Sequence, residues 1–121
     1  SIILIVSLFR LPTGEGLSPG DVKLTKLTPC LLNNNMLTPT SNFRAADTVS
    51  ICAQLDSKSP LTELYYYLLS EHLQTPIYSD ADEYPNGKIR IEIPFYLDPG
   101  EYKFEIRWGR QTLGTVMFIV D

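Results

Sequence analysis

Hydrophobic and polar side chains alternate with a period of two along much of this chain. That period predicts β-strands with one buried and one solvent-facing side. In the clearest segments apolar residues, most of them β-branched or aromatic, occupy every second position, as is typical of strands. These segments are residues 49–55, 89–93 and 102–108. The pattern therefore predicts an all-β chain.

The chain before residue 49 alternates less regularly. Residues 22–27 are predicted as a short strand between two loops. The first loop, residues 10–20, contains three glycines and two prolines. Residues 29–36, with three consecutive asparagines, and residues 39–42 interrupt any regular pattern and are predicted as irregular.

Residues 61–73 fit two patterns. Their leucines recur at the i, i+3, i+4 spacing of an amphipathic helix. Three consecutive tyrosines at 65–67 and the flanking Ser-Pro and Thr-Pro pairs favour a strand instead. We predict a strand and keep the helix as the alternative. Residues 79–87, rich in Asp, Pro, Asn and Gly, are predicted as a solvated turn, with a weak calcium site as the alternative.

Residues 2–9 form the most hydrophobic run of the chain. A bilayer-spanning helix needs about 20 apolar residues, so this run predicts no membrane span. Its β-branched composition favours an N-terminal strand or arm over residues 1–9, and a trimmed remnant of a targeting segment is the alternative. A first residue of Ser, without Met, agrees with a processed or excised piece.

Composition limits the classes of protein that remain. A length of 121 residues, 44% of them hydrophobic and 20% charged, agrees with one folded domain. Fourteen acidic residues against ten Lys and Arg give a net charge of −4. An acidic chain is the wrong sign for general binding to phosphate backbones, so no nucleic-acid partner is expected.

Residues that could perform catalysis are few. The single histidine, His72, has no nucleophile motif around any serine with which to form a triad. Cys30, Cys52 and His72 lie too far apart in sequence for a familiar metal site, and the glycines form no phosphate-binding loop. We therefore expect a protein that is not an enzyme and has no metal or cofactor.

One short segment carries a family resemblance. The Asp-x-Gly-x-Tyr pattern of Asp98, Gly100 and Tyr102 resembles the tyrosine corner of immunoglobulin-like sandwiches, in which the tyrosine hydroxyl binds nearby backbone. Residues 43–53 and 114–120 are similar to the start of strand B and to strand G of bacterial immunoglobulin-like domains. The resemblance covers about residues 43–121.

The resemblance implies an all-β, immunoglobulin-like β-sandwich of about seven to eight antiparallel strands in two sheets. One domain would then occupy residues 1–121. Its expected parts are an N-terminal strand or arm at 1–9, a loop at 10–20 and the sandwich at 21–121.

The cysteines depart from the antibody-type pattern. Ala53 and Phe104 stand where such domains carry an inter-sheet disulfide. Cys52 is out of phase with the apolar positions beside it and is predicted to point away from the core. Cys30 lies on the preceding segment, so a Cys30–Cys52 disulfide is expected if the two segments are neighbours, with free thiols as the alternative.

Several strands carry more apolar side chains than one core needs. Residues 113–120 are apolar on both faces, and residues 64–69 nearly so. Because monomers rarely expose large apolar patches, we expect the surplus to contact a protein partner or a second copy, or else to be covered by the N-terminal strand. The predicted partner-binding residues are Tyr65, Tyr67, Leu113, Met117 and Ile119.

The resemblance implies a binding, spacing or assembly role. We expect a non-catalytic protein–protein interaction module of an exported or envelope-associated protein, although a cytoplasmic location stays open. The alternative is a small-ligand or carbohydrate-binding module that uses Trp108 and the tyrosines for stacking. The strand phase counts against this alternative, because it turns Trp108 inward with Phe104 and Ile106.

Overall fold

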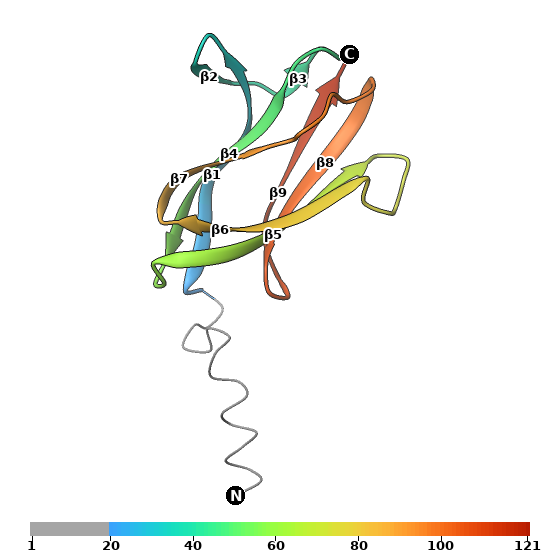
Figure 1. Cartoon of the computed structure of the whole chain (residues 1–121). Helices are drawn as coiled ribbons and strands as arrows, with labels where there is room; N and C mark the ends of the chain where they lie inside the picture. The colour runs from blue at the N-terminus through green and yellow to red at the C-terminus, as the bar shows by residue number, and fades with distance from the viewer. Residues whose placement is uncertain (1–19) are drawn as a thin grey trace, which may run out of the picture.

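A computed structural model describes residues 20–121, and the regular structure in this range consists of strands (Figure 1). The strands are β1 (Val22–Asn33), β2 (Met36–Pro39), β3 (Asn42–Phe43), β4 (Val49–Ser57), β5 (Leu61–Ser70), β6 (Tyr78–Pro85), β7 (Gly87–Glu92), β8 (Gly100–Trp108) and β9 (Gln111–Val120). The predicted all-β class is confirmed. The strand or arm expected at 1–9, and all of the expected loop before residue 20, lie outside the described residues.

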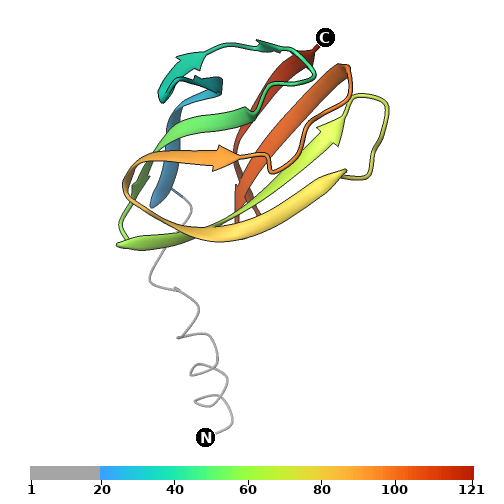
Figure 2. The same ribbon diagram turned by 45° about the horizontal axis from the view of Figure 1, so that its top comes forward.

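The strands form two sheets that face one another (Figures 1 and 2). One sheet has the order β2-β1-β4-β7 and the other the order β3-β9-β8-β5-β6. Neighbouring strands run antiparallel, except that the short β3 pairs with β9 in parallel. The two-sheet sandwich is therefore confirmed.

The core lies between the sheets and follows the predicted alternation. Leu64 and Leu68 of β5 and Phe104 and Ile106 of β8 are fully buried. The strand alternative for residues 61–73 is confirmed as far as Ser70, because β5 pairs with β6 on one side and β8 on the other. An aromatic cluster closes one end of the core. In it the Phe118 ring packs edge-on to Phe43 and is stacked on Tyr102, with ring centroids 5.6 and 5.5 Å apart.

The chain between residues 29 and 39 is more regular than predicted. β1 continues to Asn33 and returns as β2 through a tight turn. Asn34 and Asn35 have φ angles of 53° and 64°, and this type of two-residue turn needs positive φ at both positions, which asparagine tolerates. The asparagines are therefore the turn of a hairpin. β1 escaped prediction beyond residue 27 because a bulge between Thr25 and Thr28, with Lys26 at φ 54°, breaks the period of two.

The turn predicted over residues 79–87 is wrong, because most of this segment is strand β6. The reversal is confined to Asn86 and Gly87, where Gly87 takes a φ of 110°. The Asn86 side chain fixes the corner: it accepts a 2.7 Å hydrogen bond from the Ser57 N–H and donates one of 3.1 Å to the Ser59 carbonyl. The polar sequence of this segment resembles a turn because β6 is an edge strand.

The expected tyrosine corner is present. The Tyr102 hydroxyl donates a 2.6 Å hydrogen bond to the Asp98 carbonyl oxygen and so ties the start of β8 to the preceding loop. Burial raises the pKa of Tyr102, and the nearby Asp98 raises it further.

Candidate functional site

The outer face of the five-stranded sheet holds four of the five predicted partner-binding residues. Tyr65 and Tyr67 project from β5, and Met117 and Ile119 from β9. Met117 is 59% exposed, and Tyr65 and Ile119 are each 39% exposed. We name this surface the outer β5–β8–β9 face. The sequence alternation located these side chains correctly.

Leu113 differs from the prediction because it packs against the core. The pairing of β8 with β9 slips at this point: Ile106 lies opposite Gly114, whereas Arg107 lies opposite Thr112. Leu113 is the extra residue of this bulge, so the outward phase of Met117 and Ile119 does not extend to it.

A row of charged side chains runs along β8 between the two apolar groups. The row alternates in sign: Glu101, Lys103, Glu105 and Arg107. Lys103 lies opposite both Leu69 of β5 and Met117 of β9. The sequence analysis did not assign these charges to the site. The alternation along β8 could have indicated them, because these charged residues occupy the outward positions of a strand whose neighbouring strands carry exposed apolar residues.

Arg107 is held in place from two sides. Its Nε atom lies 2.6 Å from Oε2 of Glu105. Its guanidinium carbon lies 5.5 Å from the centre of the Tyr67 ring, within the range of a cation–π contact. On the same strand as Tyr67, the Tyr65 hydroxyl donates a 2.8 Å hydrogen bond to Glu63, which raises the pKa of Tyr65.

Three adjoining shallow depressions cross this face, with volumes of about 370, 400 and 360 Å³. Leu69, Gln74 and Lys103 line the first two, and Met117 lines the first and the third. The segment after β5 forms part of the wall and includes Leu73, which is 53% exposed. The face is therefore a continuous uneven surface of mixed apolar and charged character.

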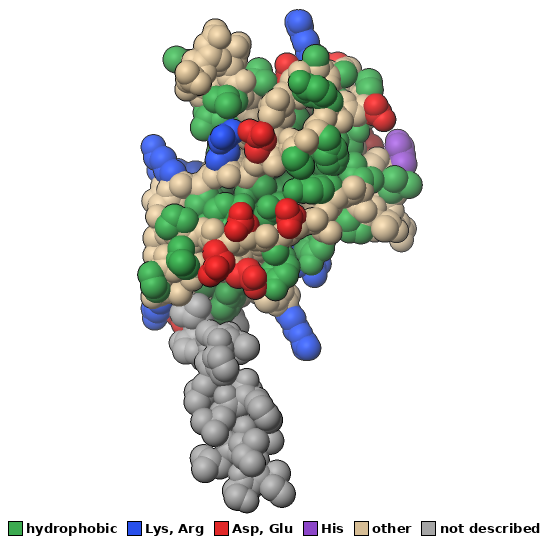
Figure 3. All heavy atoms as spheres, viewed as in Figure 1, with side chains coloured by type: hydrophobic (Ala, Val, Ile, Leu, Met, Phe, Trp, Pro, Cys, Tyr) green, Lys and Arg blue, Asp and Glu red, His purple; other side chains and the backbone are tan. Residues whose placement is uncertain are grey.

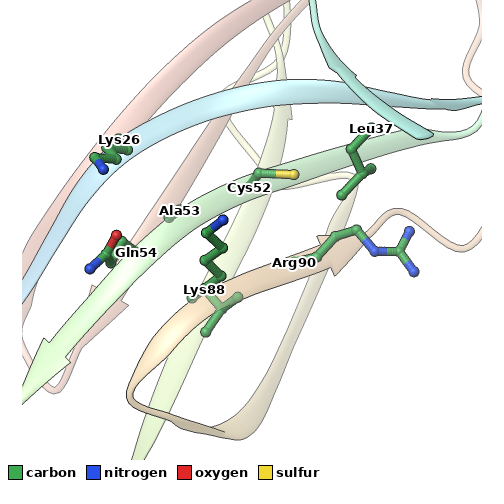
Figure 4. Close-up of a pocket in the computed structure, with 8 residues that line it drawn as sticks. Lys26, Leu37, Cys52, Ala53, Gln54, Lys88 and Arg90 are labelled. Atoms are coloured by element: carbon green, nitrogen blue, oxygen red, sulfur yellow. The ribbon is translucent and has the colours of Figure 1, made fainter. Parts of the chain in front are cut away.

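The outer face of the other sheet contains a depression of about 360 Å³ with three cations (Figure 4). Lys26 comes from the bulge of β1, and Lys88 and Arg90 come from β7. Leu37 of β2 and Cys52 of β4 add apolar surface. The sequence analysis did not bring these residues together, because it had not recognised β2 or the bulge.

Cys52 points away from the core, as predicted, and Cys30 lies beside it on β1. The two positions are diagonal neighbours, since Cys52 lies opposite Thr28 and Cys30 opposite Ser50. Both thiols are free in this structure. Burial, followed by the hydrogen bond to Cys30, raises the pKa of Cys52 to about 12. The disulfide stays a prediction.

Between residues 20 and 121, no group of three or more His, Cys, Asp or Glu side chains could hold a metal ion. His72 is exposed in the turn after β5. Trp108 is half-buried and packs against the core, so it forms no open stacking platform. The same range contains no helix that could cross a membrane.

The strand arrangement identifies the fold. Immunoglobulin domains place strands A, B and E in one sheet and C, F and G in the other. Here β1, β4 and β7 share one sheet and β5, β8 and β9 the other, with the tyrosine corner at the start of β8. The chain has an immunoglobulin-like fold.

Two solved structures are similar to this chain at low sequence identity. One similar structure is the alkylpurine DNA glycosylase AlkC of Pseudomonas fluorescens, solved bound to DNA containing an abasic site analog. It has a TM-score of 0.54 and 17% identity over 83% of this chain, which spans only 30% of the glycosylase. Another is an immunoglobulin-like protein of Pseudomonas aeruginosa, with a TM-score of 0.49 and 14% identity over 83% of this chain and 91% of that one. No protein-family model and no curated protein matches the sequence.

Proposed function

We propose that this domain is a non-catalytic protein-binding module and that it binds its partner through the outer β5–β8–β9 face. The observation that carries this proposal is the exposure of Met117, Ile119 and Tyr65 on one face, around the charged row of β8. Burial of such side chains against a partner removes apolar surface from water, at about 25 cal/mol per Å².

The composition of the face supports a protein partner. Aromatic residues, Met and Arg are enriched in protein–protein interfaces, and Tyr and Arg often contribute most of the binding energy. Tyr67 and Arg107 are already in contact, and Glu105 fixes the guanidinium. Because these side chains are ordered before binding, they lose less conformational entropy in the complex. The alternating charges would set the register of the partner.

The proposal includes a location outside the cytoplasm or in the cell envelope, as the resemblance to bacterial immunoglobulin-like domains implies. A Cys30–Cys52 disulfide in protein isolated from its own cells would support this location, because disulfides persist in oxidising compartments. Thiol titration with and without a reductant measures it. The DNA in the glycosylase structure does not extend the proposal to nucleic acid, since the likeness is one of fold and the net charge here is −4.

Site-specific photo-cross-linking tests the proposal. A benzophenone side chain is placed at position 117, at position 65 or, as a control, at the exposed position 56 on the outer side of β4. We expect the same protein adduct from positions 117 and 65 and none from 56. An equal adduct from all three positions, or none from 117 and 65, would contradict the proposed face.

A further inference from the structure

The four-stranded sheet ends in an open edge at β7. β7 pairs with β4 on one side, and no strand among residues 20–121 pairs with its other side. The Ile93 N–H donates a 2.9 Å hydrogen bond to the Val49 carbonyl, so these two opposed residues form a hydrogen-bonded pair. In an antiparallel ladder, hydrogen-bonded pairs alternate with non-hydrogen-bonded pairs. The N–H and C=O groups of every second residue before Ile93, namely Ile91 and Ile89, therefore also point to β4. The N–H and C=O groups of Lys88 and Arg90, which alternate with these isoleucines along β7, point to the open edge.

The same sheet is one strand too short to cover its partner. On the far side of the sandwich, Leu27 of β1 lies against Gly114 of β9. Counted from there, β4 lies over β8 and β7 over β5, so no strand among residues 20–121 lies above β6. The burial agrees with this count in the middle of β6. Leu64 of β5 is fully buried, whereas Asp80 and Asp82, at inward-facing positions of β6, are exposed. Tyr78 and Tyr84, on either side of them in the same phase, pack against the core. Acidic side chains gather along β6 (Figure 3).

The edge of β6, in contrast, is closed by its own side chains. The Asp80 carboxylate accepts a 2.8 Å hydrogen bond from the Ala81 N–H, and Asp82 accepts one of the same length from the Glu83 N–H. Between residues 20 and 121, no side chain caps the edge-facing N–H of Lys88 or Arg90 in this way. Edges left open in this manner can receive a further strand.

Charge defines what an added strand must carry. Its outward side chains would lie beside Lys88 and Arg90, which together with Lys26 surround the depression on that face (Figure 4). Arg90 also forms an ion pair of 3.1 Å with Glu92 of the same strand, so an acidic side chain of the added strand would share its guanidinium. Its inward side chains would face Asp80 and Asp82. Cross-strand pairs of opposite charge stabilise a sheet and like charges destabilise it. An added strand is therefore favoured when it is acidic on its outer side and basic on its inner side.

We propose that an extended peptide segment of alternating acidic and basic residues binds beside β7 as a fifth strand of the four-stranded sheet. The main-chain groups of Lys88 and Arg90 hydrogen-bond to its backbone. Its acidic side chains pair with the two cations, and its basic side chains cover β6. This site is separate from the outer β5–β8–β9 face and does not rest on the proposed function.

The probe is a fluorescent peptide of alternating Glu and Arg, titrated by anisotropy. We expect binding that the double variant Lys88→Glu/Arg90→Glu weakens about tenfold or more. The matched double variant Arg44→Glu/Arg110→Glu makes the same change of charge at exposed positions outside both proposed sites and leaves the affinity unchanged. Amide hydrogen exchange at Lys88 and Arg90 slows in the complex.

A peptide of alternating Glu and Thr tests the inner side. It binds more weakly than the Glu-Arg peptide to the wild type, and Asp80→Asn/Asp82→Asn removes that difference. Circular dichroism shows that each variant is folded. Three results would overturn the proposal. The first is no binding of the Glu-Arg peptide up to about 1 mM. The others are equal weakening of binding by both charge-reversed double variants, and unchanged amide exchange at Lys88 and Arg90 in the presence of the peptide. Protection of these amides without peptide at high protein concentration would place a second copy there and overturn it too.

Discussion

Leu27 of β1 and Gly114 of β9 meet across the gap between the two sheets. A Cβ atom at position 114 would lie 2.6 Å from Cδ2 of Leu27. Leu27 reaches this place because it belongs to the bulge between Thr25 and Thr28. The absence of a side chain at Gly114 therefore lets β1 approach β9 closely at this side of the sandwich.

Replacement of Gly114 by alanine should destabilise the fold. The terminal methyl group of Leu27 must move. Because it is the end of a flexible, half-buried side chain, we expect a loss of about 1 kcal/mol of unfolding free energy, at the low end of what overpacking costs. Urea unfolding measures the change. In the double variant Leu27→Ala/Gly114→Ala, the loss should be smaller than the sum of the two single losses. Additive losses would mean that the two positions do not interact.

The tyrosine corner should contribute measurably to stability. Tyr102→Phe removes the hydrogen bond to the Asp98 carbonyl and leaves a partly buried acceptor unpaired. We expect a loss of about 1–2 kcal/mol of unfolding free energy. Tyr96→Phe, at a tyrosine that is 70% exposed, is the control and should change nothing. Equal stability of Tyr102→Phe and wild type would show that the bond is not maintained in solution.

Alkaline pH should unfold this protein through Tyr66. Burial, followed by its hydrogen bond to Tyr84, raises the pKa of Tyr66 above the ordinary value of 10. Above pH 10 the unfolded chain loses this proton while the folded chain retains it. The resulting contribution to stability is therefore complete below pH 10 and is lost as the pH rises through the raised pKa.

Unfolding free energies between about pH 8 and 11.5 test this dependence. The wild type should lose stability steeply above pH 10, and Tyr66→Phe should lose it less steeply. Parallel curves for the two proteins would assign the alkaline loss to other groups.

Cys52 should react slowly while the protein is folded. With a pKa of about 12, its thiolate fraction at pH 8 is about one in ten thousand. Reaction with a thiol reagent under reducing pretreatment should be slow in the folded protein and fast in urea. Cys30→Ala removes one cause of the raised pKa and should speed the reaction at Cys52. Equal rates in folded and unfolded protein would refute the burial of this thiol.

Regular alternation made much of the fold predictable. The alternation around Ile51, Ile91 and Phe104 shows which side chains of β4, β7 and β8 are buried. The spacing of Asp98 and Tyr102 indicates the tyrosine corner. Such positions are set by short-range rules, namely the pleat of a strand and the geometry of one turn.

The errors occur where a neighbouring strand decides the local structure. The bulges at Lys26 and Leu113 arise from register shifts with β4 and β8, and a single strand carries no signal for its partner's register. β6 resembles a turn because Asp80 and Asp82 occupy the two middle positions of its inner face, between Tyr78 and Tyr84, which pack against the core. The two carboxylates are exposed there, because no strand of the other sheet among residues 20–121 lies above them.

The affinity of this domain for the protein captured by cross-linking from position 117 tests the central claim most directly. Met117→Asp places a charge at the most exposed of the apolar side chains named on the outer β5–β8–β9 face, without altering the core. We expect it to weaken binding about thirtyfold, as substitution of an interface residue that contributes much of the binding energy does. Asp56→Lys, on the opposite face, should leave the affinity unchanged. Wild-type affinity in Met117→Asp, with that variant fully folded, would contradict the proposal that this face binds the partner.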